Sequence, residues 1–177
     1  MNADTTIRPA RPEDAAAIAT IYNQGIAERS STFETRLRSA ADIAPWLDTP
    51  RHPLLVAVAT DDAVLGWAGL SGYRPRDCYA GIAEFSIYLD RAARGRGLGR
   101  ALLSALIDAA REHGHWKLVS RVFAFNAASR ALCRACGFRE VGIYEKHARL
   151  DGRWLDVVIV ERLIAENLTG AAGHSLP

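Results

Sequence analysis

Residues 80–114 read AGIAEFSIYLDRAARGRGLGRALLSALIDAAREHG, and this stretch decides the fold. Its first part, Ala80 to Leu89, is rich in β-forming residues and predicts a strand. Its last part repeats one apolar face from Leu98 onward and ends at Gly114, a pattern typical of a helix closed by glycine. A glycine-rich turn therefore joins a strand to an amphipathic helix.

That turn, residues 90–100, combines Gly95, Gly97 and Gly99 with a cluster of arginines: Arg91, Arg94, Arg96 and Arg100. Backbone N–H groups at a helix N-terminus, together with guanidinium groups, favour a bound phosphate. The alternative is that the glycines only permit a tight turn. A purely structural turn has no need of so many cations, so we expect an anion here.

Two common phosphate motifs do not match this turn. A P-loop needs Lys and then Ser or Thr after its last glycine, whereas Arg100 and Ala101 follow Gly99. A dinucleotide fingerprint needs a third glycine where Arg100 stands, and no parallel βαβ pattern begins the chain. Mononucleotide and dinucleotide sites are therefore disfavoured.

Helix and strand signals alternate along the rest of the chain. We expect helices at about 12–26, 40–47 and 126–136, and strands near Ile7 and at 54–59, 64–72, 117–123, 141–145 and 154–163. No linker or repeat divides them. The sequence predicts one α+β domain, residues 1–166, with a mixed, mostly antiparallel sheet, and a mobile tail at 167–177.

Composition limits the classes of partner. The 177 residues are 49% hydrophobic and 24% charged with a net charge of +2, which excludes disorder and predicts neither nucleic-acid nor membrane binding. Cys78, Cys133 and Cys136 are too few for a disulfide framework, so we expect a cytoplasmic protein. Cys133 and Cys136 form C-x-x-C, but no second ligand pair has suitable spacing, so no metal is expected.

The turn resembles the acetyl-CoA pyrophosphate loop of the GCN5-related N-acetyltransferase (GNAT) superfamily, with its pattern at Arg94, Gly97 and Gly99. Further motifs in the same order resemble the phosphinothricin and arsinothricin N-acetyltransferase branch: EFSIYL at 84–89, NAAS at 126–129, CGF at 136–138 and GRWLD at 152–156. The resemblance extends from about Ile7 to Leu163. It implies a GNAT fold and acetyl-CoA as cosubstrate.

The resemblance also implies which residues bind acetyl-CoA. The backbone of Ile87, Tyr88 and Leu89 would pair with the pantetheine arm. The pyrophosphate would be held by Arg94, Gly95, Arg96, Gly97, Leu98, Gly99 and Arg100. Asn126, with Ser129 nearby, would contact the cofactor from the following helix, although Asn126 is equally suited to cap that helix.

Acetyl transfer to an amine requires removal of a proton, and Glu84 is the candidate base. It stands in an otherwise apolar strand, where a carboxylate is costly unless it faces a cleft or an ion-pair partner. The branch places its glutamate here, but a structural ion pair is the alternative. Cys133 stands where relatives carry a histidine and is a candidate acid for protonating the leaving thiolate. The alternative is that Cys133 is only a small buried residue. His147 is a further candidate for the acid.

The segment YRPRDCY at 73–79 predicts a stiff cationic loop, in which Arg74 and Arg76 suit a carboxylate or a tetrahedral oxyanion. A solvated surface loop is the alternative. Sulfoximine-preferring relatives often carry an aromatic residue at the position of Arg76, so this departure favours a more anionic substrate. The resemblance adds Phe33 and Tyr79 as walls of the substrate site.

These features together predict an N-acetyltransferase acting on the α-amino group of a small amino acid with a tetrahedral anionic side group. Phosphinothricin, arsinothricin and methionine sulfoximine are of this type, and their acetylation would give resistance by detoxification. The resemblance also implies a homodimer. Two alternatives remain open: a non-catalytic CoA-binding regulatory module, and an acetyltransferase for a protein N-terminus or a polyamine.

Overall fold

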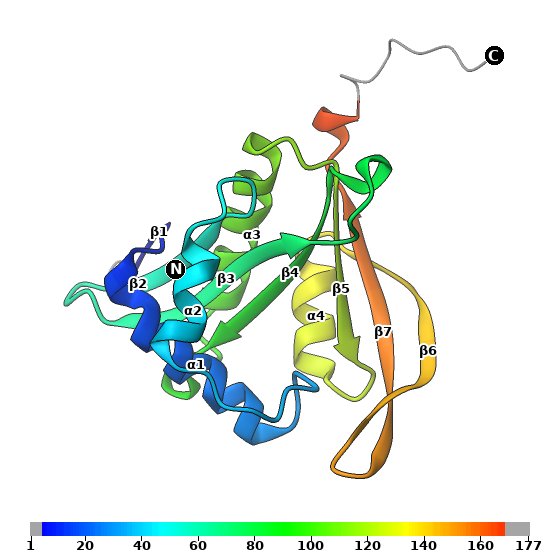
Figure 1. Cartoon of the computed structure of the whole chain (residues 1–177), viewed down its shortest axis with the longest axis horizontal. Coiled ribbons are helices and arrows are strands. Elements are labelled where there is room, and N and C mark those ends of the chain that lie inside the picture. The colour runs from blue at the N-terminus through cyan, green and yellow to red at the C-terminus, as the bar shows by residue number, and fades with distance from the viewer. Residues whose placement is uncertain (1–4, 169–177) are drawn as a thin grey trace.

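A seven-stranded sheet organises residues 5–168, which are the residues that the computed structural model describes (Figure 1). The spatial order of its strands is β1-β2-β3-β4-β5-β7-β6. The strands are β1 (Thr5–Pro9), β2 (Leu54–Ala59), β3 (Val64–Gly72), β4 (Ile82–Leu89), β5 (Lys117–Phe123), β6 (Arg139–Leu150) and β7 (Arg153–Leu163). Only β4 and β5 pair in parallel within this sheet. The predicted mixed, mostly antiparallel α+β architecture is confirmed.

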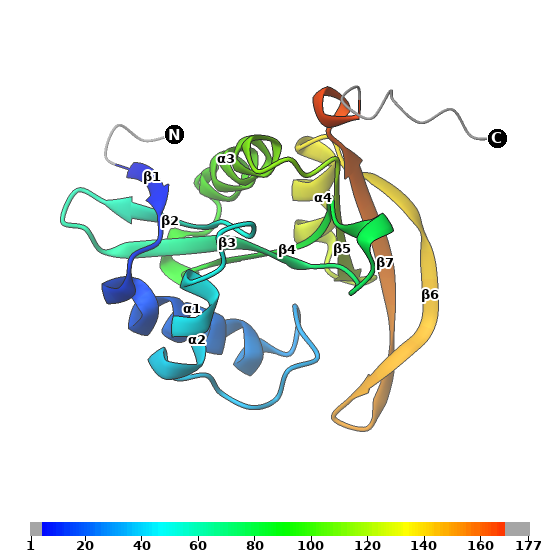
Figure 2. The same cartoon turned by 45° about the horizontal axis from the view of Figure 1, so that its top comes forward.

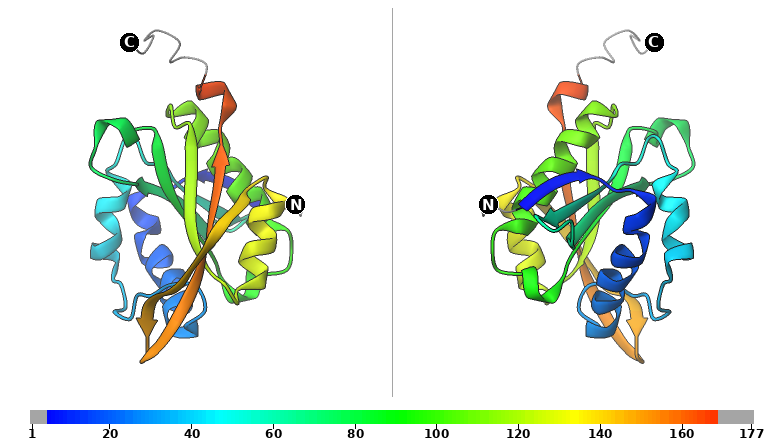
Figure 3. Two further views of the ribbon diagram at one scale, coloured as in Figure 1. Left: turned by 90° about the vertical axis from the view of Figure 1, so that its right-hand side faces the viewer. Right: turned by 90° about the vertical axis from the view of Figure 1, so that its left-hand side faces the viewer.

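Helices cover both faces of the sheet, as the side views show (Figures 2 and 3). The helices α1 (Ala15–Glu28) and α2 (Ala40–Leu47) pack on one face of β2 and β3 through an apolar cluster that includes Ile18, Ile43 and Trp67. The helices α3 (Leu98–Glu112) and α4 (Ala127–Ala135) lie on the opposite face, where Leu102 and Leu106 are fully buried. The two long helices, α1 and α3, therefore each bury an apolar stripe, as their periodicity predicts.

Most predicted elements agree with the structure, including the hairpin of β2 and β3. The first helix is an exception, because residues Pro12–Asp14 form a separate 3-10 turn before α1 begins. Another exception is β6, which extends over 139–150 rather than 141–145. Most of its residues are exposed on both faces, so hydrophobic alternation fades, and two register shifts interrupt its pairing with β7.

The parallel pair β4 and β5 separates along its length, and this separation creates the site. The two strands pair only where residues 82–84 of β4 face residues 117–119 of β5. Beyond that point the hydroxyl of Ser120 donates to the carbonyl of Phe85 at 3.0 Å. From Ser86 onward β4 pairs with β3 on one side but faces no β5 ladder on the other, so the backbone groups on that open side remain available to an added extended chain.

The C-terminal end of the described chain is fastened to the domain. Ala165–Asn167 form a 3-10 turn, and the amide of Asn167 donates to the carbonyls of Arg111 and His115, each at 2.8 Å. The remainder of the predicted tail, residues 169–177, lies outside the described residues. None of the helices found in residues 5–168 has the length and apolar character needed to cross a membrane.

Candidate active site

The glycine turn before α3 has the geometry that an anion site requires. Gly95 and Gly97 adopt φ values of +76° and +79°, a conformation that favours glycine. A Cβ atom added at either position would meet no atom within 4 Å, so both glycines border open space. Gly97 is also the N-cap of α3 and carries no side chain to satisfy the first N–H groups of that helix. The turn therefore fits a pyrophosphate.

Two of the clustered arginines have a structural partner, and a contact of Arg94 with the pyrophosphate stays a prediction. Arg91 and Arg94 both pair with Glu28 of α1, at 2.5 and 3.0 Å. The pKa of Glu28 is lowered from its ordinary value. Partial burial alone would raise this pKa, but the hydrogen bonds from Arg91 and Arg94 outweigh that effect. Arg96 and Arg100 are exposed and form no salt bridge with any described residue. These two are the cations of the cluster that have no ion-pair partner among the described residues.

A cleft of about 80 Å³ follows the separation of β4 and β5. It brings together five residues predicted to lie in the site: Ile87, Tyr88, Asn126, Ser129 and Cys133. Leu89, also predicted, does not line the cleft and packs against the core. Residues that are distant in sequence thus form one continuous surface beside the glycine turn.

Asn126 performs the capping role that was left open. Its side-chain oxygen accepts from the backbone N–H of Ser129 at 3.0 Å at the start of α4. Its amide nitrogen donates to the carbonyl of Ser30 at 2.9 Å, which ties α4 to the segment after α1. The structural interpretation of Asn126 is therefore confirmed, and its contact with acetyl-CoA stays a prediction.

Cys133 lines the cleft but is a poor proton donor. The residue is only 2% exposed, and burial raises the pKa of its thiol to about 12. An ordinary thiolate has a pKa near 8.5, so proton transfer from Cys133 to such a group is strongly uphill. The alternative of a small buried residue agrees with this environment. His147 is exposed on β6, with its ring 5.3 Å from that of Tyr144.

A second cavity, of about 460 Å³, lies on the sheet face that bears Glu84, and we call it the acceptor cavity. Its lining includes Arg74, Tyr79, Glu84, Lys117, Ser120, Arg121, Tyr144 and Glu161. Glu84 Oε2 lies 2.5 Å from a guanidinium nitrogen of Arg121 on β5. The Glu84 and Arg121 side chains are 26% and 47% exposed, so the expected ion pair exists and faces the cavity.

The loop that precedes β4 contributes one of its two arginines to the acceptor cavity. Arg74 lines the cavity, with its guanidinium 5.1 Å from the ring centre of Tyr73 and 6.0 Å from that of Tyr79. Arg76 is exposed, does not line the cavity and precedes the 3-10 turn Asp77–Tyr79. Arg74 and Arg76 are separated only by Pro75, yet only the side chain of Arg74 lines the cavity.

Phe33 is also displaced from the predicted group of substrate residues. Its ring packs against Phe123 at 4.7 Å, near the C-terminal end of β5, and not against Arg74 or Tyr79. Phe123 lines the cleft between β4 and β5, so Phe33 backs the cleft and not the acceptor cavity. The side-chain contacts of the loop after α1 cannot be read from local sequence.

Sequence reasoning missed Arg121 and Ser120, which line both the cleft and the acceptor cavity. The alternation of β5 places Arg121 on the face of Lys117 and Val119, but only the β4–β5 register brings it to Glu84. Two other charges of the cavity pair with each other, because Lys117 contacts Glu161 at 2.9 Å.

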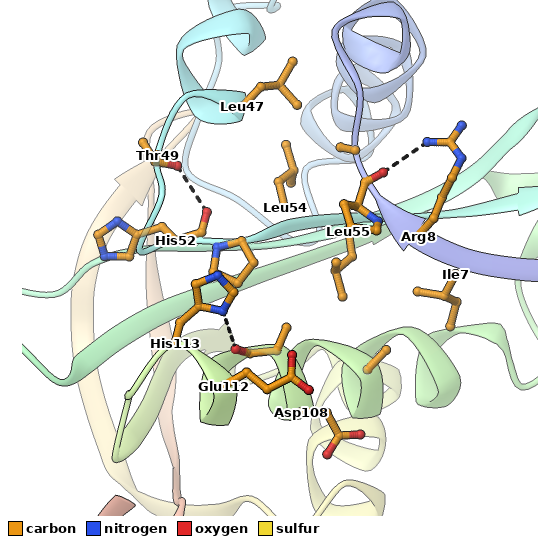
Figure 4. Close-up of a pocket in the computed structure, with 15 residues that line it drawn as sticks. Ile7, Arg8, Leu47, Thr49, His52, Leu54, Leu55, Asp108, Glu112 and His113 are labelled. Atoms are coloured by element: carbon orange, nitrogen blue, oxygen red, sulfur yellow. Dashed lines mark hydrogen bonds between the residues drawn. The ribbon is translucent and has the colours of Figure 1, made fainter.

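A third hollow, of about 510 Å³, lies elsewhere and contains none of the predicted residues (Figure 4). It is formed by β1, the start of β2 and the C-terminal half of α3, where Asp108, Glu112 and His113 border it. The glycine turn stands at the other end of α3. Size alone therefore does not indicate where the chemistry occurs. Among the described residues, no group of His, Cys, Asp and Glu side chains could hold a metal ion.

Comparison with known proteins agrees with this geometry. The family model described as "Acetyltransferase (GNAT) domain" matches residues 4–139. A methionine sulfoximine/methionine sulfone acetyltransferase of Pseudomonas aeruginosa is 34% identical over 159 residues, covering 88% of this chain and 92% of that protein. A phosphinothricin N-acetyltransferase of Alcaligenes faecalis is 38% identical over 165 residues, covering 89% and 81%.

A solved structure extends the comparison to the fold and the cosubstrate. A phosphinothricin acetyltransferase from Sinorhizobium meliloti, in complex with acetyl-CoA, superposes with a TM-score of 0.84 at 33% identity, covering 90% of this chain and 88% of that one. The open glycine turn and the separated strands of this chain fit the same cosubstrate. The chain belongs to the GNAT family of acetyl-CoA-dependent N-acetyltransferases.

Proposed function

We propose that the acceptor is the α-amino group of a small amino acid with a tetrahedral anionic side group, of the phosphinothricin, arsinothricin or methionine sulfoximine type. The observation that carries this proposal is that Glu84 and Arg74 line one cavity beside the cleft between β4 and β5. A carboxylate suits the amine, and a guanidinium suits a phosphinate or arsinate. Acetylation of such compounds would give resistance by detoxification.

Acetyl-CoA supplies an acetyl thioester, which reacts with a neutral amine. Because an α-ammonium group is mostly protonated near pH 7, the carboxylate of Glu84 removes its proton, directly or through water. Ile87 and Tyr88 line the cleft, where their backbone would hold the pantetheine arm so that the thioester could reach the acceptor cavity. Transfer is direct, within a complex of enzyme and both substrates, and needs no acyl-enzyme. The amine nitrogen forms the amide bond as the C–S bond of the thioester breaks, and CoA leaves as a thiolate that takes a proton from water.

The variant Glu84→Gln tests this function, because it preserves the side-chain shape and removes the base. We expect turnover to fall by roughly 10²-fold or more while acetyl-CoA affinity, measured by calorimetry, persists. Near-normal turnover would assign proton removal to another group or to water alone.

A substrate panel separates the proposal from its alternatives. Phosphinothricin, arsinothricin and methionine sulfoximine should be acetylated faster than a polyamine or a peptide N-terminus, since Arg74 repels a polycation. Acetyl-CoA binding without acetylation of any of these compounds would favour the non-catalytic CoA-binding module.

We also propose that the enzyme is a homodimer in the cytoplasm. Apolar side chains outside the acceptor cavity are exposed on β6 and β7, among them Ile143, Trp154 and Leu163, and a second copy would cover such a surface. All three cysteines are free thiols, which agrees with a reducing compartment. Light scattering at micromolar concentration should report twice 19.3 kDa, and a species of 19.3 kDa alone would reject the dimer.

A further inference from the structure

The ion pair between Glu84 and Arg121 stands where the cofactor cleft meets the acceptor cavity. The two side chains come from adjacent strands, and their charged atoms lie 2.5 Å apart. Arg121 lines both the cleft and the cavity, whereas Glu84 lines the cavity. Glu84 faces Val119 in the parallel register, so Arg121 follows just beyond the last paired residues, where the strands separate.

A half-buried carboxylate and an exposed guanidinium at this spacing are complementary to the two charges of an α-amino acid. Such a substrate carries an ammonium and a carboxylate on one carbon, so its ammonium can meet Glu84 while its carboxylate meets the adjacent guanidinium. The substrate then replaces one charge-assisted contact with two, and neither protein charge loses its partner. An amine without a carboxylate would draw Glu84 away and leave Arg121 unpaired.

We propose that Arg121 binds the α-carboxylate of the acceptor and thereby selects α-amino acids over simple amines. This inference rests on the proposed function, since it assigns a further contact in the same cavity. With Glu84 on the amine and Arg74 on the anionic side group, Arg121 completes a three-point site.

The other cations near the cavity are less suited to this role. Lys117 contacts Glu161 at 2.9 Å, and Glu161 also receives a hydrogen bond from Arg139. Arg74 lies over tyrosine rings on the loop before β4 and forms no salt bridge within residues 5–168. Arg121 is therefore the guanidinium placed against the proposed base.

The test compares two acceptors that differ only in the α-carboxylate: phosphinothricin and 3-aminopropyl(methyl)phosphinic acid. The variant Arg121→Met should lower kcat/KM for phosphinothricin about ten- to a hundredfold, mainly through KM. The analogue should change by no more than about twofold. Arg121→Lys should give an intermediate loss, because it keeps the charge and loses the planar fork.

Arg139→Met is the matched control, since it removes an exposed guanidinium that pairs with Glu161 near the same cavity. It should affect both acceptors equally and by about twofold or less. Thermal melting and calorimetry with acetyl-CoA verify that each variant folds and binds the cosubstrate.

Equal losses on both acceptors in Arg121→Met would show that Arg121 only positions Glu84, and no loss on either would show that it is a solvated residue. Either result overturns the assignment and leaves the proposed function intact. Wild-type enzyme that acetylates the analogue as well as phosphinothricin would also overturn it. Wild-type enzyme that acetylates neither would overturn the proposed acceptor, and with it this assignment.

Discussion

Two glycines at opposite ends of α3 provide a controlled test of the anion site. Gly97 precedes the helix and Gly114 follows it, both adopt φ +79°, and an added Cβ would meet no atom within 4 Å at either position. The variants Gly97→Asp and Gly114→Asp therefore impose the same backbone strain of about 1–2 kcal/mol and the same added charge. The two variants differ only in whether the added charge lies at the N-terminus or at the C-terminus of α3.

The helix dipole orders the stabilities of these two variants. A carboxylate stabilises a helix N-terminus by about 0.3–1 kcal/mol and destabilises a C-terminus by a similar amount. Gly97→Asp should therefore unfold at a higher urea concentration than Gly114→Asp.

Affinity for acetyl-CoA should follow the opposite order. An aspartate at position 97 places negative charge where the pyrophosphate approaches, so we expect at least a tenfold loss, or about 1.4 kcal/mol. Gly114→Asp should bind as the wild type does. Calorimetry measures the affinities and urea unfolding the stabilities. Equal affinities in the two folded variants would refute the anion site.

Two further predictions concern the acceptor and the pH dependence of stability. Arg74→Met should lower kcat/KM for phosphinothricin about ten- to a hundredfold, because Arg74 lines the acceptor cavity. Arg76→Met should change kcat/KM by about twofold at most, because Arg76 does not line the cavity. A larger loss in Arg76→Met than in Arg74→Met would contradict these positions. His115 is fully buried, and burial lowers its pKa, so the unfolded chain binds a proton that the folded protein excludes. The free energy of unfolding should therefore fall as pH drops below about 6.5, by about 1.4 kcal/mol per unit of pKa lowering. Urea unfolding measures the loss in the free energy of unfolding between pH 7.5 and pH 5.5. This loss should be smaller in His115→Gln than in the matched exposed variant His113→Gln. Equal losses in the two variants would assign the pH dependence to other groups.

Local patterns determined most of the secondary structure. The β2–β3 hairpin, α3 with its glycine ends and the N-cap at Asn126 each depend on neighbours within a few residues. For such features, side-chain periodicity, capping and positive φ at glycine are sufficient. The glycine turn before α3 was also predictable, because its conformation and its position at a helix N-terminus are local properties.

The partners of charged residues were decided by the tertiary structure. Glu28 pairs with Arg91 and Arg94 of the turn, which lie more than sixty residues away in the sequence, so local composition did not reveal that these two charges have a partner in the protein. Arg74 and Arg76 flank one proline and cannot be told apart by composition, yet only Arg74 lines the acceptor cavity.

The lining of the acceptor cavity depends on the pairing of strands. Glu84 was predicted from its own strand, because a carboxylate in an apolar run needs a cleft or a partner. Arg121 was not, because the β4–β5 register that brings it to 2.5 Å from Glu84 joins residues 37 positions apart. A sequence shows which side chains are available for chemistry. It does not show which charges interact, because the energy of an ion pair falls steeply with the distance between the charges. Only the folded sheet determines those distances.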